Sequence, residues 1–321
     1  MVRPQFDALV GQGTAVALLC RAVDQRRVAP AYLFAGPHGV GRRLAAACFA
    51  EVLFTPLDSG APPATLGRRI AQRNHPDLLW VEPTYLHQGK LIGVTQAAEE
   101  GLSRKSPPQT RLDQVRQIAQ FLSRPPLEAP RAVVVIEAAE TMAEGAANGL
   151  LKTLEEPGQA TIILLAPGPQ ALLPTLVSRC QTIPFQRLNG ADLATVLRRV
   201  GHEAVLDQPQ MMAMAQGSPG VAIAAHQQLQ AIPPDLISAL QTPPRSLREA
   251  LDQARQVAKA LDTESQLWLL DYLLNWYWQS QPGSSARWLP GFEAAKGYLR
   301  RFVNPRLVWE VTLMQLWEAS A

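Results

Sequence analysis

The sequence predicts an α/β domain built on a doubly wound parallel sheet, followed by two all-α segments. Short β-branched or aromatic runs alternate with segments of helical periodicity through about the first 187 residues, and the strand signals fade after Phe185. The chain has 321 residues, 47% of them hydrophobic, which is longer than a single core usually grows. We therefore expect a multidomain protein whose fold class is α/β plus all-α.

Five stretches have the composition of strands buried in such a sheet. They are residues 32–35, 78–81, 132–136, 161–165 and 182–185. Between them, apolar residues from Leu112 to Leu122 recur at helical spacing. A second helix carries Leu150 and Leu154 and must end near Pro157, because proline disfavours helical backbone at the residue before it. This alternation predicts a doubly wound domain over residues 1–187.

The remainder of the chain predicts two helical domains. Residues 188–230 read as a short helical segment interrupted by a GSPG turn, and residues 231–321 contain amphipathic stretches separated by PP and PGSS turns. Pro233 and Pro234 lie in a segment with the composition of a linker. We therefore place the domain boundaries at 187/188 and 230/231.

Composition and charge exclude several classes of protein. The net charge is +3 with 18% charged residues, so the chain lacks the dense basic field of an autonomous nucleic-acid binder, and any DNA contact is expected to be shared with partners. Its apolar runs are too short to cross a bilayer, which predicts a cytoplasmic protein. Cys20, Cys48 and Cys180 are widely separated and form no CxxC pair, so we expect buried reduced thiols rather than disulfides or a zinc module.

Residues 84–110 are long for a connection inside a compact domain, which predicts a surface excursion. Lys90, Arg104 and Lys105 in this stretch suit either contact with a phosphate backbone or simple solvation. Small charge clusters are weak indicators of a site, so solvation is the favoured interpretation.

The segment GPHGVGRR at residues 36–43 has the frame of a phosphate-binding loop. It follows the first strand and opens a helix, and Gly36, Gly39 and Gly41 lie where backbone amides must approach phosphates. A working loop then carries Lys, which reaches the phosphates, and Ser or Thr, which holds Mg²⁺. Arg42 and Arg43 stand at these two positions, and Arg43 offers no oxygen to a metal. We expect no metal and no required cofactor; ATP or ADP can still bind where hydrolysis is lost.

A glycine-rich turn between strand and helix also occurs in many α/β proteins as tight packing alone. An acidic position at the appropriate topological distance weakens this alternative, because Glu137 directly follows the strand at 132–136. Ala138 comes next. The glycine loop and the acidic position after the strand together predict an ancestral nucleotide fold whose chemistry has degenerated.

Two further motifs are more specific. They are NGLLKTLEEP at residues 148–157 and LLPTLVSRCQ at residues 172–181. With AYLFAGPHGVG, the HPD segment and GSPG, they resemble the signature of clamp-loader subunits in the AAA+ family, over the chain up to about residue 225. The resemblance implies an AAA+ domain at 1–187, a small helical lid domain at 188–230 and a helical collar for oligomerisation at 231–321.

In that family the arginine of the SRC segment, here Arg179 beside Ser178, reaches the γ-phosphate of ATP held by a neighbouring subunit. Arginine suits this role because it is always protonated and presents several donors; such fingers contribute roughly 10³ to 10⁵ in rate. An ordinary surface arginine near a helix end is the alternative, and the motif around Arg179 favours the finger.

The sequence departs from the motor subunits of the family and is similar to the delta-prime type, which has altered nucleotide loops. Motor subunits carry Asp then Glu where this chain has Glu137 and Ala138, so the carboxylate that orients water is missing. The four-cysteine zinc module before the HPD segment is also missing, so zinc is not expected. Residues 166–168 read Ala-Pro-Gly at the sensor position, which weakens nucleotide sensing.

The C-terminal part is rich in tryptophan, which suits either a packed collar or the domain's own core. Residues 231–321 hold Trp268, Trp276, Trp278, Trp288, Trp309 and Trp317. The family resemblance implies contacts with sister subunits in a ring, where buried aromatic residues are favoured. Both interpretations stay open for each tryptophan.

The resemblance as a whole implies a scaffold subunit of the DNA polymerase III clamp loader that hydrolyses no ATP itself and donates Arg179 during sliding-clamp loading in DNA replication. The implied partners are gamma/tau motor subunits and the delta subunit in a heteropentamer, the sliding clamp and primer–template DNA. Two alternatives remain: an ATP-hydrolysing AAA+ motor in which Arg42 does the work of lysine, and a nucleotide-binding regulator outside replication.

Overall fold

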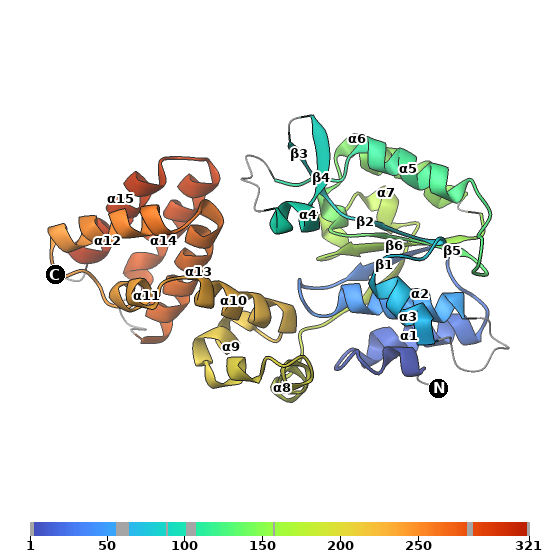
Figure 1. Ribbon diagram of the computed structural model, residues 1–321, viewed down its shortest axis with the longest axis horizontal. Coiled ribbons are helices and arrows are strands. Elements are labelled where there is room, and N and C mark those ends of the chain that lie inside the picture. The colour runs from blue at the N-terminus through green and yellow to red at the C-terminus, as the bar shows by residue number, and fades with distance from the viewer. Residues whose placement is uncertain are drawn as a thin grey trace. The chain divides into compact units, whose positions relative to one another are not determined.

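The computed structural model describes residues 3–55, 64–87, 89–100, 107–156, 158–280 and 285–319. The chain forms two compact units, Met1–Thr195 and Val196–Ala321 (Figure 1). The first unit is α/β and the second is helical, as the sequence predicts. The finer division into three domains stays a prediction.

A five-stranded parallel sheet forms the centre of the first unit, in the order β2-β5-β6-β1-β7. The strands are β1 (Ala31–Ala35), β2 (Leu78–Val81), β5 (Ala132–Ile136), β6 (Ala160–Ala166) and β7 (Gln181–Pro184). All five predicted strands are confirmed, and their ends differ from the prediction by at most one residue. The strands that carry the phosphate loop and Glu137, β1 and β5, both pair with β6.

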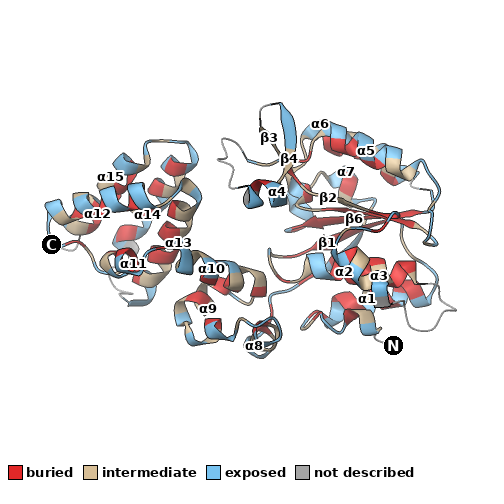
Figure 2. Cartoon of the chain, viewed as in Figure 1, coloured by how far each residue is buried: buried red, intermediate tan, exposed pale blue. Residues whose placement is uncertain are grey.

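Helices cover both faces of this sheet, which is why its three inner strands, β5, β6 and β1, are buried along their length (Figure 2). Tyr32 and Phe34 of β1 pack with α1 (Gly13–Asp24), α2 (Arg42–Phe54) and α3 (Ala64–Ala71). Leu33, between them, packs on the opposite face with the second group of helices. That group consists of α5 (Leu112–Leu122), α6 (Glu144–Glu155) and α7 (Pro174–Val177). The alternation confirms the doubly wound arrangement.

Part of the predicted excursion forms a hairpin of its own, which the sequence analysis did not anticipate. The strands β3 (Thr84–His87) and β4 (Lys90–Gly93) pair in antiparallel fashion, and α4 (Val94–Glu99) follows them. Lys90 is exposed on this hairpin. Arg104 and Lys105, the other two charges considered in this stretch, lie outside the described residues. Three short 3₁₀ helices complete this unit: η1 (Pro4–Phe6), η2 (Ala139–Thr141) and η3 (Pro169–Ala171).

The HPD segment before β2 organises the loop that leads into β5. The buried Asp77 carboxylate accepts hydrogen bonds from the backbone amides of Leu127, Glu128 and Ala129 at 2.7, 2.8 and 2.7 Å. His75 is buried beside Asp77, and its ring is stacked on the ring of Phe54. Burial raises the pKa of Asp77, but the three amide bonds outweigh it and hold the pKa below its ordinary value. Asp77 thus has a structural role.

The second unit is built from helices and their connections. Its elements are the end of α8 (Gly190–Arg199), the 3₁₀ helix η4 (Glu203–Asp207), α9 (Pro209–Ala215), α10 (Pro219–Ala231), α11 (Pro234–Leu240), α12 (Leu247–Ala260), α13 (Thr263–Ser280), α14 (Ser285–Arg300) and α15 (Pro305–Glu318). Proline stands at the start of several of these helices, where its missing N–H costs no hydrogen bond. Ser218 and Ser246 cap α10 and α12. Across the described residues, no helix is long and apolar enough to cross a membrane.

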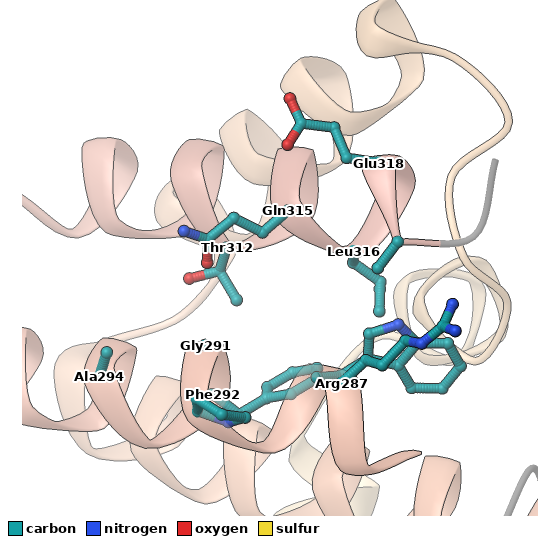
Figure 3. A pocket seen from close by; sticks show the side chains of 11 residues that line it. Arg287, Gly291, Phe292, Ala294, Thr312, Gln315, Leu316 and Glu318 are labelled. Carbon is teal, nitrogen blue, oxygen red and sulfur yellow. The ribbon is translucent and has the colours of Figure 1, made fainter. Parts of the chain in front are cut away.

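The tryptophans of the second unit divide between core and surface. Trp309 is fully buried and its indole N–H donates to Gln266 Oε1 at 2.9 Å, so it belongs to the unit's own core. Trp288 is buried as well, whereas Trp278 is 55% exposed. A cavity of about 550 Å³ lies between α14 and α15, and Figure 3 shows Phe292, Thr312 and other side chains along it. None of the predicted site residues lines this cavity.

Replacing Asp77 with alanine is expected to destabilise the first unit by about 2–4 kcal/mol at pH 7, because three backbone amides lose the buried carboxylate that accepts their hydrogen bonds. A carboxylate with a lowered folded-state pKa stabilises above its unfolded pKa, about 3.9, and this contribution is lost as pH falls through the folded pKa. Urea unfolding should therefore show a difference between wild type and Asp77→Ala that shrinks below about pH 4.

Asp113→Ala provides the matched control, because that carboxylate is exposed and pairs only with Arg116 across one helical turn. Its effect should stay within about 0.5 kcal/mol. A cost of Asp77→Ala that is the same at pH 7 and at low pH would contradict the role assigned to the charged carboxylate.

Candidate functional site

The phosphate loop joins β1 to α2 with the geometry that the sequence predicts. Arg42 is the first residue of α2, and Gly41 caps the helix with φ of 102°. Gly39 also has a positive φ, 75°. Both conformations lie in the left-handed region that glycine adopts without strain. The Gly36 amide donates to the carbonyl of Ala166 at 3.2 Å, so the loop starts as a continuation of the sheet.

Protein packing alone also demands Gly36, because backbone atoms lie beside it, whereas Gly41 faces only the end of a leucine side chain. A Cβ on Gly36 would lie 2.4 Å from the carbonyl oxygen of Phe185, and one on Gly41 would lie 2.9 Å from Leu9 Cδ1. Buried Gln12 donates to the carbonyls of Val40 and Gln186 at 3.1 and 2.7 Å, so it ties the loop to the segment after β7. The loop is thus held in shape by the protein itself, and its glycines do not by themselves indicate a bound phosphate.

Arg42 stands in the lysine position with an unused donor. Its Nη1 atom is buried and has no hydrogen-bond acceptor among the described residues. Burial lowers the pKa of Arg42, and the charge of Glu140 partly opposes this shift. A guanidinium with an unused donor at the start of a helix is compatible with an anion, because both the charge and the helix dipole favour one there.

Arg43 occupies the Ser/Thr position and forms an ion pair with Glu137 directly after β5. The distance from Arg43 Nε to Glu137 Oε1 is 2.9 Å. The same oxygen accepts from Arg73 Nη2 at 3.0 Å and from the indole N–H of Trp80. Ala138 follows in the left-handed region and supplies no second carboxylate. The structure thus brings Arg43 and Glu137 together, with two residues that the sequence analysis missed.

Mg²⁺ does not fit this arrangement. The metal needs oxygen ligands in near-octahedral geometry, but the hydroxyl position carries Arg43 and the one acidic group beside it already faces two guanidinium groups. In the described part of the chain, no group of three or more His, Cys, Asp or Glu residues could hold a metal ion. The residues at this edge of the sheet therefore do not fit a bound Mg²⁺ ion.

Arg179 lies on the surface just after α7. Pro174 is the first residue of this short helix, and Ser178 caps its end, with Oγ donating to the Thr175 carbonyl at 3.1 Å. Arg179 is 37% exposed; its Nη1 donates to the same carbonyl at 3.0 Å and its Nη2 lies 2.7 Å from Glu155 Oε1. Glu155 ends α6, so this ion pair joins the two specific motifs. Pro157, which closes the first motif, lies outside the described residues.

The predicted site residues therefore fall into two groups. Arg42, Arg43 and Glu137 lie around the start of α2, and Ser178 and Arg179 lie after α7. The described contacts of Arg179 go to Thr175 and Glu155, and none goes to the residues around α2. This separation suits a chain in which a surface arginine and a degenerate pocket have different roles.

Comparisons with known proteins agree with the fold and with the motifs. The family model described as DNA polymerase III, delta subunit matches residues 11–189, and the model described as cyanobacterial DNA polymerase III delta prime, C-terminal domain matches residues 191–316. Together with the sheet, these matches define a protein of the DNA polymerase III subunit class with a doubly wound α/β domain. The chain belongs to the DNA polymerase III delta subunit family, and its relatives include delta' subunits as well as tau and gamma/tau subunits.

The relatives share part of their length with this chain. It is 36% identical over 181 residues to DNA polymerase III subunit delta' of Bacillus subtilis, covering 55% of this chain and 48% of that protein. It is 34% identical over 206 residues to subunit delta' of Pseudomonas aeruginosa, covering 62% and 56%. The chain thus spans about half the length of these relatives.

A solved structure supports the fold over almost the whole chain. It is that of a DNA polymerase III gamma subunit-related protein from Thermotoga maritima, with a TM-score of 0.58 and 16% identity. The match covers 96% of this chain and all of that one. At this identity the similarity concerns the fold alone.

Gly36→Ala is expected to destabilise the first unit by about 1–3 kcal/mol, because the added methyl group would overlap the backbone of Phe185 and force the loop to shift. Thermal unfolding of the isolated chain measures this loss. ATP should not restore the stability, because the conflict is with protein atoms.

Gly13→Ala is the matched control, because a Cβ there has no atom within 4 Å and the residue begins α1. Alanine in a helix is neutral to slightly stabilising relative to glycine. Wild-type stability of Gly36→Ala would mean that packing does not require the glycine.

Proposed function

We propose that this chain is a delta-prime-type subunit of the DNA polymerase III clamp loader, that it hydrolyses no ATP itself, and that it supplies Arg179 to ATP bound by a neighbouring motor subunit. The observation that carries the proposal is the exposed position of Arg179 in the SRC motif. In the same chain, the acidic residue of its own pocket, Glu137, forms ion pairs with Arg43 and Arg73. The delta-prime names of the relatives support the clamp-loader role.

The surroundings of Arg179 suit a finger that acts in trans. Its ion-pair partner Glu155 is 52% exposed, and exposed ion pairs contribute little to stability, so the guanidinium can leave this partner at small cost. The bond from Nη1 to the Thr175 carbonyl keeps the side chain near the end of α7. Arginine then offers several donors to the charge that develops on a transferring phosphoryl group. Ser178 positions Arg179 by closing the last turn of α7.

The partners follow from this role. The proposed complex is a heteropentamer with gamma/tau motor subunits and a delta subunit, and it acts on the sliding clamp at primer–template DNA. The net charge of +3 on this chain suits shared rather than independent DNA contact.

Two other functions are less well supported. An ATP-hydrolysing motor would need a metal ligand and a carboxylate that orients water, and the chain has Arg43 and Ala138 at those positions. The unused donor of Arg42 is the one observation that favours it. A nucleotide-binding regulator outside replication is disfavoured, because both family models that match the chain describe DNA polymerase III subunits.

In a reconstituted loader with clamp and primed DNA, Arg179→Ala is expected to slow ATP hydrolysis at the receiving site by about 10³-fold or more. The steady-state ATPase rate of the loader should therefore fall by the fraction of total turnover that the receiving site contributes. Size-exclusion chromatography should show that the variant loader assembles normally. The isolated chain should be inactive, and its stability should change by less than about 0.5 kcal/mol in the variant.

Arg116→Ala is the matched control, because Arg116 is exposed on α5 and pairs with Asp113 of the same helix. It should leave the ATPase of the loader unchanged. An unaltered rate with Arg179→Ala would refute the finger. Turnover by the isolated chain that Arg42→Ala abolishes would support the motor instead.

A further inference from the structure

Three donors converge on one oxygen of Glu137, whose side chain is 16% exposed. They come from separate parts of the chain: Arg43 from the first turn of α2, Arg73 from the turn after α3, and Trp80 from β2. The guanidinium carbon of Arg73 also lies 5.3 Å from the centre of the Trp80 ring, within the range of a cation–π contact. One oxygen of the Glu137 carboxylate, Oε1, is thus engaged by three protein groups.

Arg73 reaches this position through an uncommon backbone conformation. Its φ is 55°, in the left-handed region, and its amide donates to the carbonyl of Ile70 at 3.0 Å as α3 ends. A residue with a side chain is uncommon in this region, and glycine is the usual choice at the end of a helix. Arginine here costs some backbone energy, which the contacts of its side chain offset.

The ion pairs continue from Arg73 towards the inserted hairpin. Arg73 Nη1 lies 3.6 Å from Glu82 Oε2, and the same oxygen accepts from Thr95 Oγ1 at 2.5 Å. Thr95 belongs to α4, directly after the hairpin. Two guanidinium groups therefore face two carboxylates, Glu137 and Glu82, and their charges balance without a metal.

This balance matters because a nucleotide site of this fold otherwise needs a divalent cation between its acidic residue and the phosphates. Two guanidinium groups carry the same total charge as one Mg²⁺ ion. They are much larger and bind in fixed directions, so a hydrated metal cannot approach the oxygen that they share.

We propose that Arg43 and Arg73 form an internal counter-cation that replaces Mg²⁺ at Glu137, and that Arg73 at the same time positions the inserted hairpin and α4 through Glu82 and Thr95. The pocket is then complete without metal, and its conformation does not depend on nucleotide state. The proposal concerns the isolated chain and stands independently of the clamp-loader role.

A double-mutant cycle on the full chain tests the ion pair. Arg73→Gln and Glu137→Gln should each lower the Tm of the first unit by about 3–6 °C, because each removes one member of a partly buried ion pair and leaves the other with fewer partners. The double variant should lose clearly less than the sum of the two shifts. Additive shifts would overturn the proposal. The exposed pair Arg116→Gln and Asp113→Asn serves as control and should show no coupling.

Metal binding tests the replacement directly. Mn²⁺ titrations followed by electron paramagnetic resonance should show the same metal binding in the wild type and in Glu137→Gln, because no site depends on this carboxylate. The Tm of the wild type should be equal in Mg²⁺ and in EDTA, with or without ATP. A Mn²⁺ site that depends on Glu137, or a rise in Tm that requires Mg²⁺, would overturn the proposal. Neither measurement needs a variant of Arg43 or Arg73 to fold.

The indole N–H of Trp80 gives a local readout that a general loss of stability would not move. Its ¹⁵N resonance, assigned with Trp80→Phe, should shift in Glu137→Gln, because the acceptor of the indole N–H changes. It should also shift in Arg73→Gln, because that acceptor loses an ion-pair partner. It should stay in place when Mg²⁺ is added to the wild type. A shift with Mg²⁺ that is absent in Glu137→Gln would mean that the metal reaches the carboxylate.

Discussion

The parallel pairing of β1 and β5 with β6 is the constraint on which the rest of the first unit depends. The carboxyl ends of parallel strands meet at one edge of a sheet, and this edge is where open α/β sheets bind ligands. The segment after β1 and the residue after β5 are brought together there, whatever their chemistry. In this chain they are Arg43 and Glu137, and an ion pair has formed where a metal site would otherwise stand.

The loop at the same edge is held in shape by contacts within the protein. Gly36 is required by the backbone of Phe185, and Gln12 fixes the loop carbonyl of Val40, so the shape of the loop is preserved by packing and hydrogen bonding. Loss of the lysine and hydroxyl positions therefore leaves the loop intact. A recognisable glycine pattern accordingly indicates ancestry more reliably than it indicates a bound nucleotide.

Much of this was predictable because it is local in sequence. The strands follow from short β-branched runs, and the helix ending near Pro157 follows from proline stereochemistry; α6 indeed ends at Glu155. Arg73 was not predictable as a partner of Glu137, since 64 residues separate them and only the folded sheet brings them together. The β3–β4 hairpin was missed because many side chains of this two-stranded sheet are exposed, so its strands show little of the hydrophobic patterning that identifies a strand in a sequence. The pairing of Arg179 with Glu155 likewise depends on the packing of α6 against α7.

These two arginine environments also differ in how firmly the side chain is held. Arg73 meets a mostly buried carboxylate, an indole ring and a second carboxylate, so moving it would break several contacts at once in a poorly solvated place. Arg179 meets one exposed carboxylate and one carbonyl, and water can replace both. The pocket around Glu137 is therefore held more firmly than the arginine that is proposed to serve another subunit. A subunit that donates a finger without cycling its own nucleotide needs this combination, because the finger can then respond to the neighbour's phosphate from a base that stays in place.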